Sequence, residues 1–132
     1  MSLIDWEKKY YKSVEGAKDW TDKKCAEHTL KKYRGVKKVK DYDLILEDSE
    51  LHLKGTDHFF VFGSHTCSFC EKYYKENNKK PCRNCPLHKE KNNCDIDNSA
   101  YDLFTKENDP NPMIKLMKTI ISKCDTEGKY VK

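Results

Sequence analysis

Residues 67–94 have the sequence CSFCEKYYKENNKKPCRNCPLHKEKNNC and hold five of the seven cysteines of the chain. Two Cys-x2-Cys pairs are separated by eleven residues, and a further cysteine follows eight residues after the second pair. Each pair can form a tight turn whose two sulfurs converge on one ion, and two such turns complete a tetrahedral zinc site. The spacing predicts a closed structural Zn²⁺ site, with ligands drawn from Cys67, Cys70, Cys82, Cys85 and Cys94.

The cluster offers more donors than the four that a structural zinc site accepts. Cys67 and Cys70 are expected to bind the metal, and the three remaining cysteines of the cluster compete for the other two positions. The neighbouring His65 and His88 are expected at the surface or in hydrogen bonds to the ligands. Pro86 also restricts the turn that would bring His88 to the metal. The sequence leaves the choice of ligands open.

The cellular compartment decides whether these cysteines are thiols or disulfides. The N-terminus lacks an apolar signal core, and the chain has no run of about 18 or more apolar residues, so we expect a cytoplasmic protein without a membrane segment. In that reducing compartment an odd number of cysteines in Cys-x2-Cys pairs favours a metal. An iron–sulfur cluster is the alternative cofactor, although the third regularly spaced cysteine of the bacterial ferredoxin pattern is missing.

A zinc deaminase is an alternative interpretation of some of the same residues. The chain contains a PCxxC motif, which supplies Cys82 and Cys85, and a CxE motif, which supplies Cys25 and Glu27. In a deaminase the three cysteines would hold zinc and the glutamate would transfer protons. However, the residues before Cys25 suggest a helix rather than the required strands, and three cysteines of the cluster would have no role. No other catalytic motif is present, so we expect a binding protein rather than an enzyme.

The chain has the length of one ordinary domain, because 132 residues can build a single modest core. Only 36% of the residues are apolar, so a metal is expected to supplement that core. The predicted fold class is α+β, with a three-stranded antiparallel sheet, flanking helices and a zinc-knuckle or ribbon-like cysteine cluster. The expected parts are a helical segment over residues 1–40, the sheet and cluster over 41–104, and a C-terminal helix over 111–125.

Apolar periodicity and end signals locate the first helices. A short helix with an aromatic stripe is expected near residues 3–10. The second helix is expected to run from its N-cap Thr21 to Arg34, with Gly35 as its C-cap. Ser99 begins a capping pattern and therefore predicts a short helix after the cysteines.

The last helix carries the clearest apolar stripe, with Asn111 as its expected cap and Pro112 in its first turn. Between the second helix and the cysteines, alternating apolar residues predict three short antiparallel strands, over residues 42–46, 51–53 and 58–62. Cys25 and Cys124 are expected to be buried as small apolar side chains. The stripe of the last helix is expected to pack into the core and comprises Met113, Leu116, Met117, Ile120, Ile121 and Cys124.

The cysteines and the residues that follow them also resemble a known group. The order CxxC, then CxxCPL, then Cys94, then Tyr101 with Phe104 three residues later, is similar to small, uncharacterised cysteine-rich zinc-binding proteins of phages and prophage regions. The resemblance covers about a third of the chain. It implies an intracellular, metal-stabilised protein that is made during infection or carried by a mobile element, in the host-cell cytoplasm if it is phage-encoded, and it implies no activity.

The distribution of charged residues along the chain indicates which kind of partner the protein binds. Four thiolates around Zn²⁺ would lower the net charge from +4 to about +2, so local clusters matter more than the total. A basic cluster is followed directly by five acidic residues within 41–50. We expect the basic cluster to bind nucleic-acid phosphates, with Phe69, Tyr73 or Tyr74 stacking on bases. If the acidic residues neutralise the cluster, the alternative is a protein-binding host-takeover or anti-defence inhibitor. The basic residues are Lys31, Lys32, Arg34, Lys37, Lys38 and Lys40.

Overall fold

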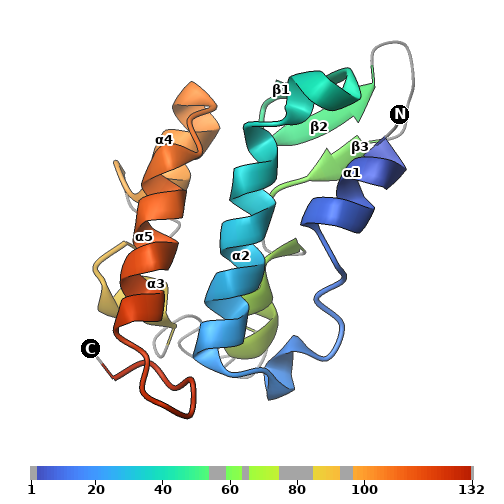
Figure 1. Cartoon of the computed structure of the whole chain (residues 1–132). Coiled ribbons are helices and arrows are strands. Elements are labelled where there is room, and N and C mark those ends of the chain that lie inside the picture. Colours follow the sequence, from blue (N-terminus) through green and yellow to red (C-terminus); the bar gives the residue numbers. More distant parts are fainter. Residues whose placement is uncertain (1–2, 54–58, 64–65, 75–84, 93–96, 132) are drawn as a thin grey trace.

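The computed structural model describes residues 3–53, 59–63, 66–74, 85–92 and 97–131. These residues form an α+β domain with a three-stranded antiparallel sheet, as predicted (Figure 1). In chain order the elements are α1 (Leu3–Tyr10), η1 (Ala17–Asp19), α2 (Asp22–Val36), η2 (Val39–Tyr42), β1 (Leu44–Glu47), β2 (Glu50–Leu53), β3 (Phe59–Val61), η4 (Cys70–Tyr74), α3 (Pro86–Lys89), α4 (Ala100–Glu107) and α5 (Asn111–Ser122).

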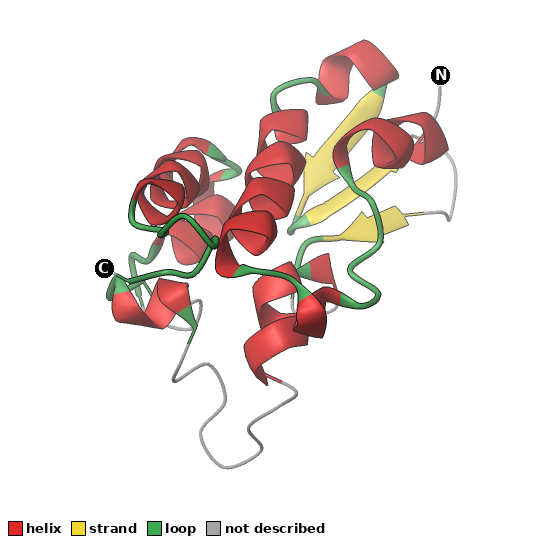
Figure 2. Ribbon diagram, turned by 60° about the horizontal axis from the view of Figure 1, so that its bottom comes forward, coloured by secondary structure: helices red, strands yellow, loops and turns green. Residues whose placement is uncertain are grey.

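Helix α2 lies at the centre of the molecule, with the sheet and α1 on one side and α4 and α5 on the other (Figure 1, Figure 2). Aromatic rings connect the two sides. The ring centroid of Phe62 lies 5.0 Å from that of Phe104, which lies 5.0 Å from that of Tyr33 in α2. Trp6 of α1 contacts Phe60 of β3 at 5.3 Å. Segments from both ends of the chain therefore share one core.

Among the described residues, no helix is long and apolar enough to cross a membrane.

Helix α2 begins where the sequence predicts but ends later. The Thr21 side chain accepts a hydrogen bond from a backbone N–H of the first turn at 3.1 Å, which confirms the N-cap. The predicted C-cap is wrong, because Gly35 lies inside the helix. A glycine is needed there for close packing: a Cβ atom would lie 2.6 Å from Tyr10 Cγ, and the Gly35 carbonyl accepts a hydrogen bond from Trp6 Nε1 at 2.9 Å.

All three predicted strands form, in the order β1-β2-β3. Asp48 and Ser49 connect β1 to β2 with φ angles of 49° and 65°, as in the two-residue turns that match the twist of a hairpin. Leu51 of β2 lies opposite Phe60 of β3, and both are buried. Tyr42, which was expected in the first strand, belongs to η2.

The C-terminal helices pack as their apolar stripes predict. Ser99 caps α4 by accepting a hydrogen bond from a backbone N–H at 3.2 Å, and the α5 stripe is buried from Met113 to Ile120. Asn111 is not the cap of α5. It is the first helical residue, and its N–H donates to Asp109 Oδ1 at 2.9 Å. Cys124 follows the end of α5 and is only partly buried, so its predicted burial is wrong in degree.

Candidate functional site

The first Cys-x2-Cys pair lies at the N-terminal end of η4, with Cys67 just before the helix and Cys70 as its first residue. The Cys67 sulfur accepts hydrogen bonds from the thiol of Cys70 and from the backbone N–H groups of Cys70 and Phe69. The bond from the Cys70 thiol contributes most, and together these groups overcome the effect of burial and lower the pKa of Cys67 to about 6. These hydrogen bonds therefore stabilise a thiolate at Cys67, which is the form of cysteine that binds metal.

Lys32 is buried next to the segment that carries these cysteines and does not lie at the surface. Its exposed fraction is 1%, and its Nζ donates a hydrogen bond to the Thr66 carbonyl at 2.8 Å. The rings of Tyr33 and Phe62 lie 5.2 and 5.7 Å from the ammonium group. The expectation that Lys32 contacts a nucleic acid is therefore wrong, because position 32 lies on the buried side of α2. Its positive charge instead helps to lower the pKa of Cys67.

The structure brings together only part of the predicted ligand set. Cys67 and Cys70 meet as a pair, whereas Cys85 is buried at the start of α3. Among the described residues, no three potential metal ligands gather in one place. His88 is exposed on α3. The other predicted or weighed ligands, Cys82, Cys94 and His65, lie outside the described residues.

Cys25 has the properties of a buried apolar side chain, as predicted. It is fully buried in α2, and burial raises its pKa to about 12. A raised pKa makes it costlier for this thiol to lose the proton that zinc must displace. Glu27, the proton-transfer residue of the deaminase interpretation, is exposed and lines a groove beside α2. These positions give no support to a zinc centre built on Cys25 and Glu27.

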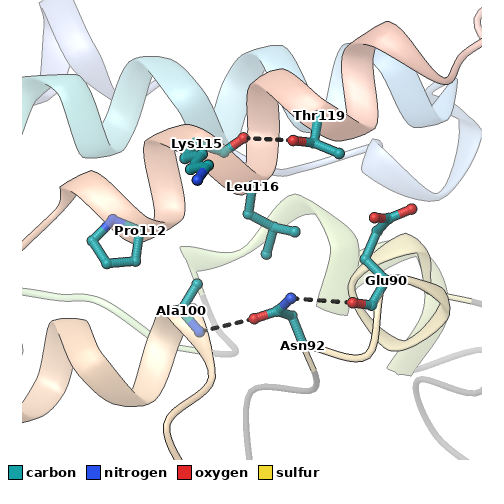
Figure 3. A pocket seen from close by; sticks show the side chains of 7 residues that line it. All are labelled: Glu90, Asn92, Ala100, Pro112, Lys115, Leu116 and Thr119. Atoms are coloured by element: carbon teal, nitrogen blue, oxygen red, sulfur yellow. Dashed lines mark hydrogen bonds between the residues drawn. The ribbon is translucent and has the colours of Figure 1, made fainter.

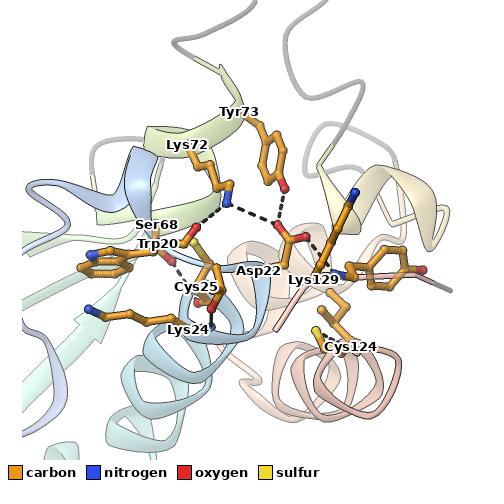
Figure 4. A network of polar contacts seen from close by, with 12 residues as sticks. Trp20, Asp22, Lys24, Cys25, Ser68, Lys72, Tyr73, Cys124 and Lys129 are labelled. Carbon is orange, nitrogen blue, oxygen red and sulfur yellow. Dashed lines mark hydrogen bonds and ion pairs between the residues drawn. The ribbon is translucent and has the colours of Figure 1, made fainter. Parts of the chain in front are cut away.

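A polar network joins the cysteine-bearing segment to the start of α2 (Figure 4). The buried Asp22 carboxylate accepts hydrogen bonds from the Tyr73 hydroxyl and, at 2.9 Å, from the Tyr130 N–H. Lys72 Nζ lies 3.9 Å from the same carboxylate and donates to the Trp20 carbonyl. The network therefore connects η1, the N-terminus of α2, η4 and the C-terminal segment at Tyr130, which forms an isolated β-bridge with Cys124.

Two of the aromatic residues that were expected to stack on bases are not freely accessible. Tyr73 is half-buried and uses its hydroxyl in the network, and Phe69 is buried in the core. Phe69 is therefore unavailable for stacking, and Tyr73 is a poor candidate. The side chain of Tyr74 lies outside the described residues.

Five of the six residues in the predicted basic cluster are exposed, and so is Lys24, two helical turns before Lys31 on the same side of α2. In the described part of the chain, no ion pair joins these cations to the acidic residues of 41–50. Glu47 instead lies 4.0 Å from His52. We call the six exposed cations the basic surface: Lys24, Lys31, Arg34, Lys37, Lys38 and Lys40.

A groove of about 370 Å³ lies beside this surface, between α2 and the connection from α1 to η1. The neutral form of His28 is favoured because burial lowers its pKa, and its Nε2 hydrogen-bonds to the Lys12 carbonyl across the groove. Sequence reasoning missed this site. Its signal was the helical spacing of Lys24, His28 and Lys31 directly after Trp20. The lining residues are Tyr10, Lys12, Trp20, Lys24, Glu27, His28 and Lys31.

A second pocket, of about 260 Å³, lies where α4, α5 and the residues after α3 meet (Figure 3). Its polar groups mostly bond to one another. The Asn92 side chain accepts from Ala100 N at 3.2 Å and donates to the Glu90 carbonyl at 3.1 Å, and the Thr119 hydroxyl donates to the Lys115 carbonyl at 3.1 Å. These contacts make the pocket a weaker candidate than the groove beside α2.

Comparison of the chain with family models, curated proteins and solved structures finds no match in any of the three. The functional argument therefore rests on the residues and their geometry.

Proposed function

We propose that this chain is a nucleic-acid-binding protein that contacts phosphates through the basic surface. The observation that supports this most directly is the exposure of Lys31, Arg34 and Lys38, with no ion pair to a carboxylate among the described residues. Exposed cations that are not already neutralised release counterions from the nucleic acid when they bind phosphates, and this release drives binding.

The proposal includes a structural Zn²⁺ ion held by Cys67, Cys70 and two more of the clustered cysteines. The hydrogen bonds that stabilise the Cys67 thiolate fit such a ligand, and the Cys-x2-Cys spacing fits a zinc turn. The ion would crosslink the segment that carries Lys72 and Tyr73, which in turn contact Trp20 and Asp22. Zinc would therefore act through the position of the binding surface and not through chemistry.

Elemental analysis of the purified protein tests the metal assignment. We expect one zinc per chain and no iron, because each closed site takes four ligands and the cluster has five cysteines. Iron together with acid-labile sulfide would contradict the zinc assignment and indicate the iron–sulfur alternative.

Charge reversal tests the nucleic-acid assignment. Replacing three cations of the basic surface, Lys31→Glu, Arg34→Glu and Lys38→Glu, should weaken binding to labelled DNA and RNA by more than about tenfold at about 50 mM salt. The loss should be similar for different sequences, because phosphate contacts carry no sequence information. Unchanged binding, or no binding by the unmodified protein, would contradict the proposal. The matched control reverses three exposed lysines elsewhere, Lys115, Lys118 and Lys129.

One observation favours a protein partner as the second candidate. Phe59 and Val61 are 53% and 41% exposed on β3, which is an edge strand of the described sheet. Exposed apolar residues on an edge strand can pair with a strand of another protein. A host-takeover or anti-defence inhibitor would use this edge. Replacing both residues with serine would then abolish its effect on the host and leave nucleic-acid binding unchanged.

A further inference from the structure

The groove beside α2 carries a positive charge and an aromatic wall. Lys12, Lys24 and Lys31 line it together with one carboxylate, that of Glu27. Three cations against one anion favour an anionic ligand. All four side chains are exposed, and the groove volume of about 370 Å³ lies in the range of small-molecule sites, about 300–1,000 Å³.

Trp20 provides an aromatic surface in the same groove. It is partly exposed, unlike Trp6, which is fully buried. The ammonium group of Lys24 lies 4.5 Å from the Trp20 ring centroid (Figure 4 shows the two side chains on the same side of α2). Because Lys24 is exposed and flexible, a ligand ring can take its place on the indole while the ammonium group moves to a phosphate.

The backbone around the groove is held before any ligand binds. Lys72 donates to the carbonyl of Trp20 from the cysteine-bearing segment, and His28 hydrogen-bonds to the carbonyl of Lys12 from α2. The rings of His28 and Trp20 also lie 5.3 Å apart. These contacts hold both walls of the groove in place, so little conformational entropy is lost when a ligand binds.

From these observations we propose that the groove binds one unpaired base of a single-stranded nucleic acid. The base stacks on Trp20, and the flanking phosphates lie on Lys12, Lys24 and Lys31. Bases in a duplex are stacked and paired, so they cannot present a face to an indole, whereas the bases of a single strand can. This inference rests on the proposed nucleic-acid binding, and it adds a preference for single strands and a residue that confers it.

Fluorescence anisotropy tests the proposal, with a dye-labelled oligothymidylate of about 20 nucleotides and a labelled duplex of similar length as the probes, so that variants without Trp20 can be measured in the same way. The single strand should quench Trp20 and bind more tightly than the duplex. Trp20→Leu should weaken single-strand binding by about 5- to 100-fold, the equivalent of losing one base–aromatic stack, and change duplex binding by less than about twofold. Trp20→Phe, which retains an aromatic face, should restore most of the affinity.

The possible results separate this inference from the function on which it rests. If Trp20→Leu folds normally and binds both probes as the unmodified protein does, the groove is not a base site, and phosphate binding by the basic surface stands. Equal losses for both probes also contradict the base site. If neither probe binds at about 50 mM salt, the nucleic-acid function fails and the base site fails with it. The exposed Lys118→Ala serves as the matched surface control.

Discussion

At the scale of single residues, Gly35 shows why a helix does not always end at its glycine. The sequence suggests a C-cap, but the residue allows α1 to approach α2 closely. A local rule could not anticipate this, because the requirement comes from Trp6 and Tyr10, which are more than twenty residues earlier in the sequence.

Gly35→Ala should therefore destabilise the protein, although alanine is the better helix former by about 1 kcal/mol. The new Cβ would lie 2.6 Å from Tyr10 Cγ and 2.9 Å from Trp6 Cζ2, and overpacking of this kind costs about 1–3 kcal/mol. Chemical denaturation measures the change in unfolding free energy. The exposed neighbour Arg34→Ala is the control, and a stabilised Gly35→Ala variant would show that the two helices do not pack as described.

His28 should make stability depend on pH. Burial lowers its pKa below that of an unfolded histidine, and the nearby Lys32, Lys24 and Lys31 act in the same direction. On acidification through about pH 6.5 the unfolded chain therefore binds a proton that the folded chain does not, so the histidine contributes stability above that pH and loses it below.

Denaturation of the unmodified protein and of His28→Gln at about pH 7.5 and about pH 5.5 checks this sign. The variant should lose less stability on acidification, because the other histidines are common to both proteins. The exposed His88→Gln should behave as the unmodified protein does. An equal loss in the His28→Gln variant would contradict the assigned role.

At the scale of elements, the sequence predicted what depends on local periodicity. The apolar stripes of α2 and α5 and the alternation in the three strands specify buried faces directly. The same helical geometry shows why a run of basic residues is not a continuous surface: Lys31 and Lys32 are about 100° apart around α2, so one is exposed and the other is buried. The groove could not be predicted, because Lys12 and Trp20 approach α2 only through tertiary contacts.

The contacts among elements predict that Asp22→Asn destabilises the fold. An asparagine loses the negative charge beside Lys72 and weakens the hydrogen bonds with Tyr73 and Tyr130, at a cost of about 1–3 kcal/mol. The unfolding free energy measures this cost. Asp19→Asn, an exposed change in η1, is the control, and equal stability of the two variants would contradict the role of the network.

At the scale of the whole molecule, the cysteine-bearing segment is part of the single core. Phe62, Phe69 and Phe104 are buried together with residues of α1, α2 and α5. If zinc is bound, its removal should therefore lower the unfolding temperature of the entire chain in one transition. Calorimetry with and without a chelator measures this. An unchanged transition, with loss of the metal confirmed, would show that the ion does not support the fold.

The most direct test of nucleic-acid binding is the salt dependence of affinity for an unstructured single strand. Log affinity should fall linearly with log salt concentration, with a slope of about −0.7 for each phosphate contact. Replacing Lys31, Arg34 and Lys38 together with alanine should make that slope less negative by about 2, because three contacts are lost. The same slope in both proteins, or affinity that does not change with salt, would contradict the claim that the basic surface binds nucleic acid.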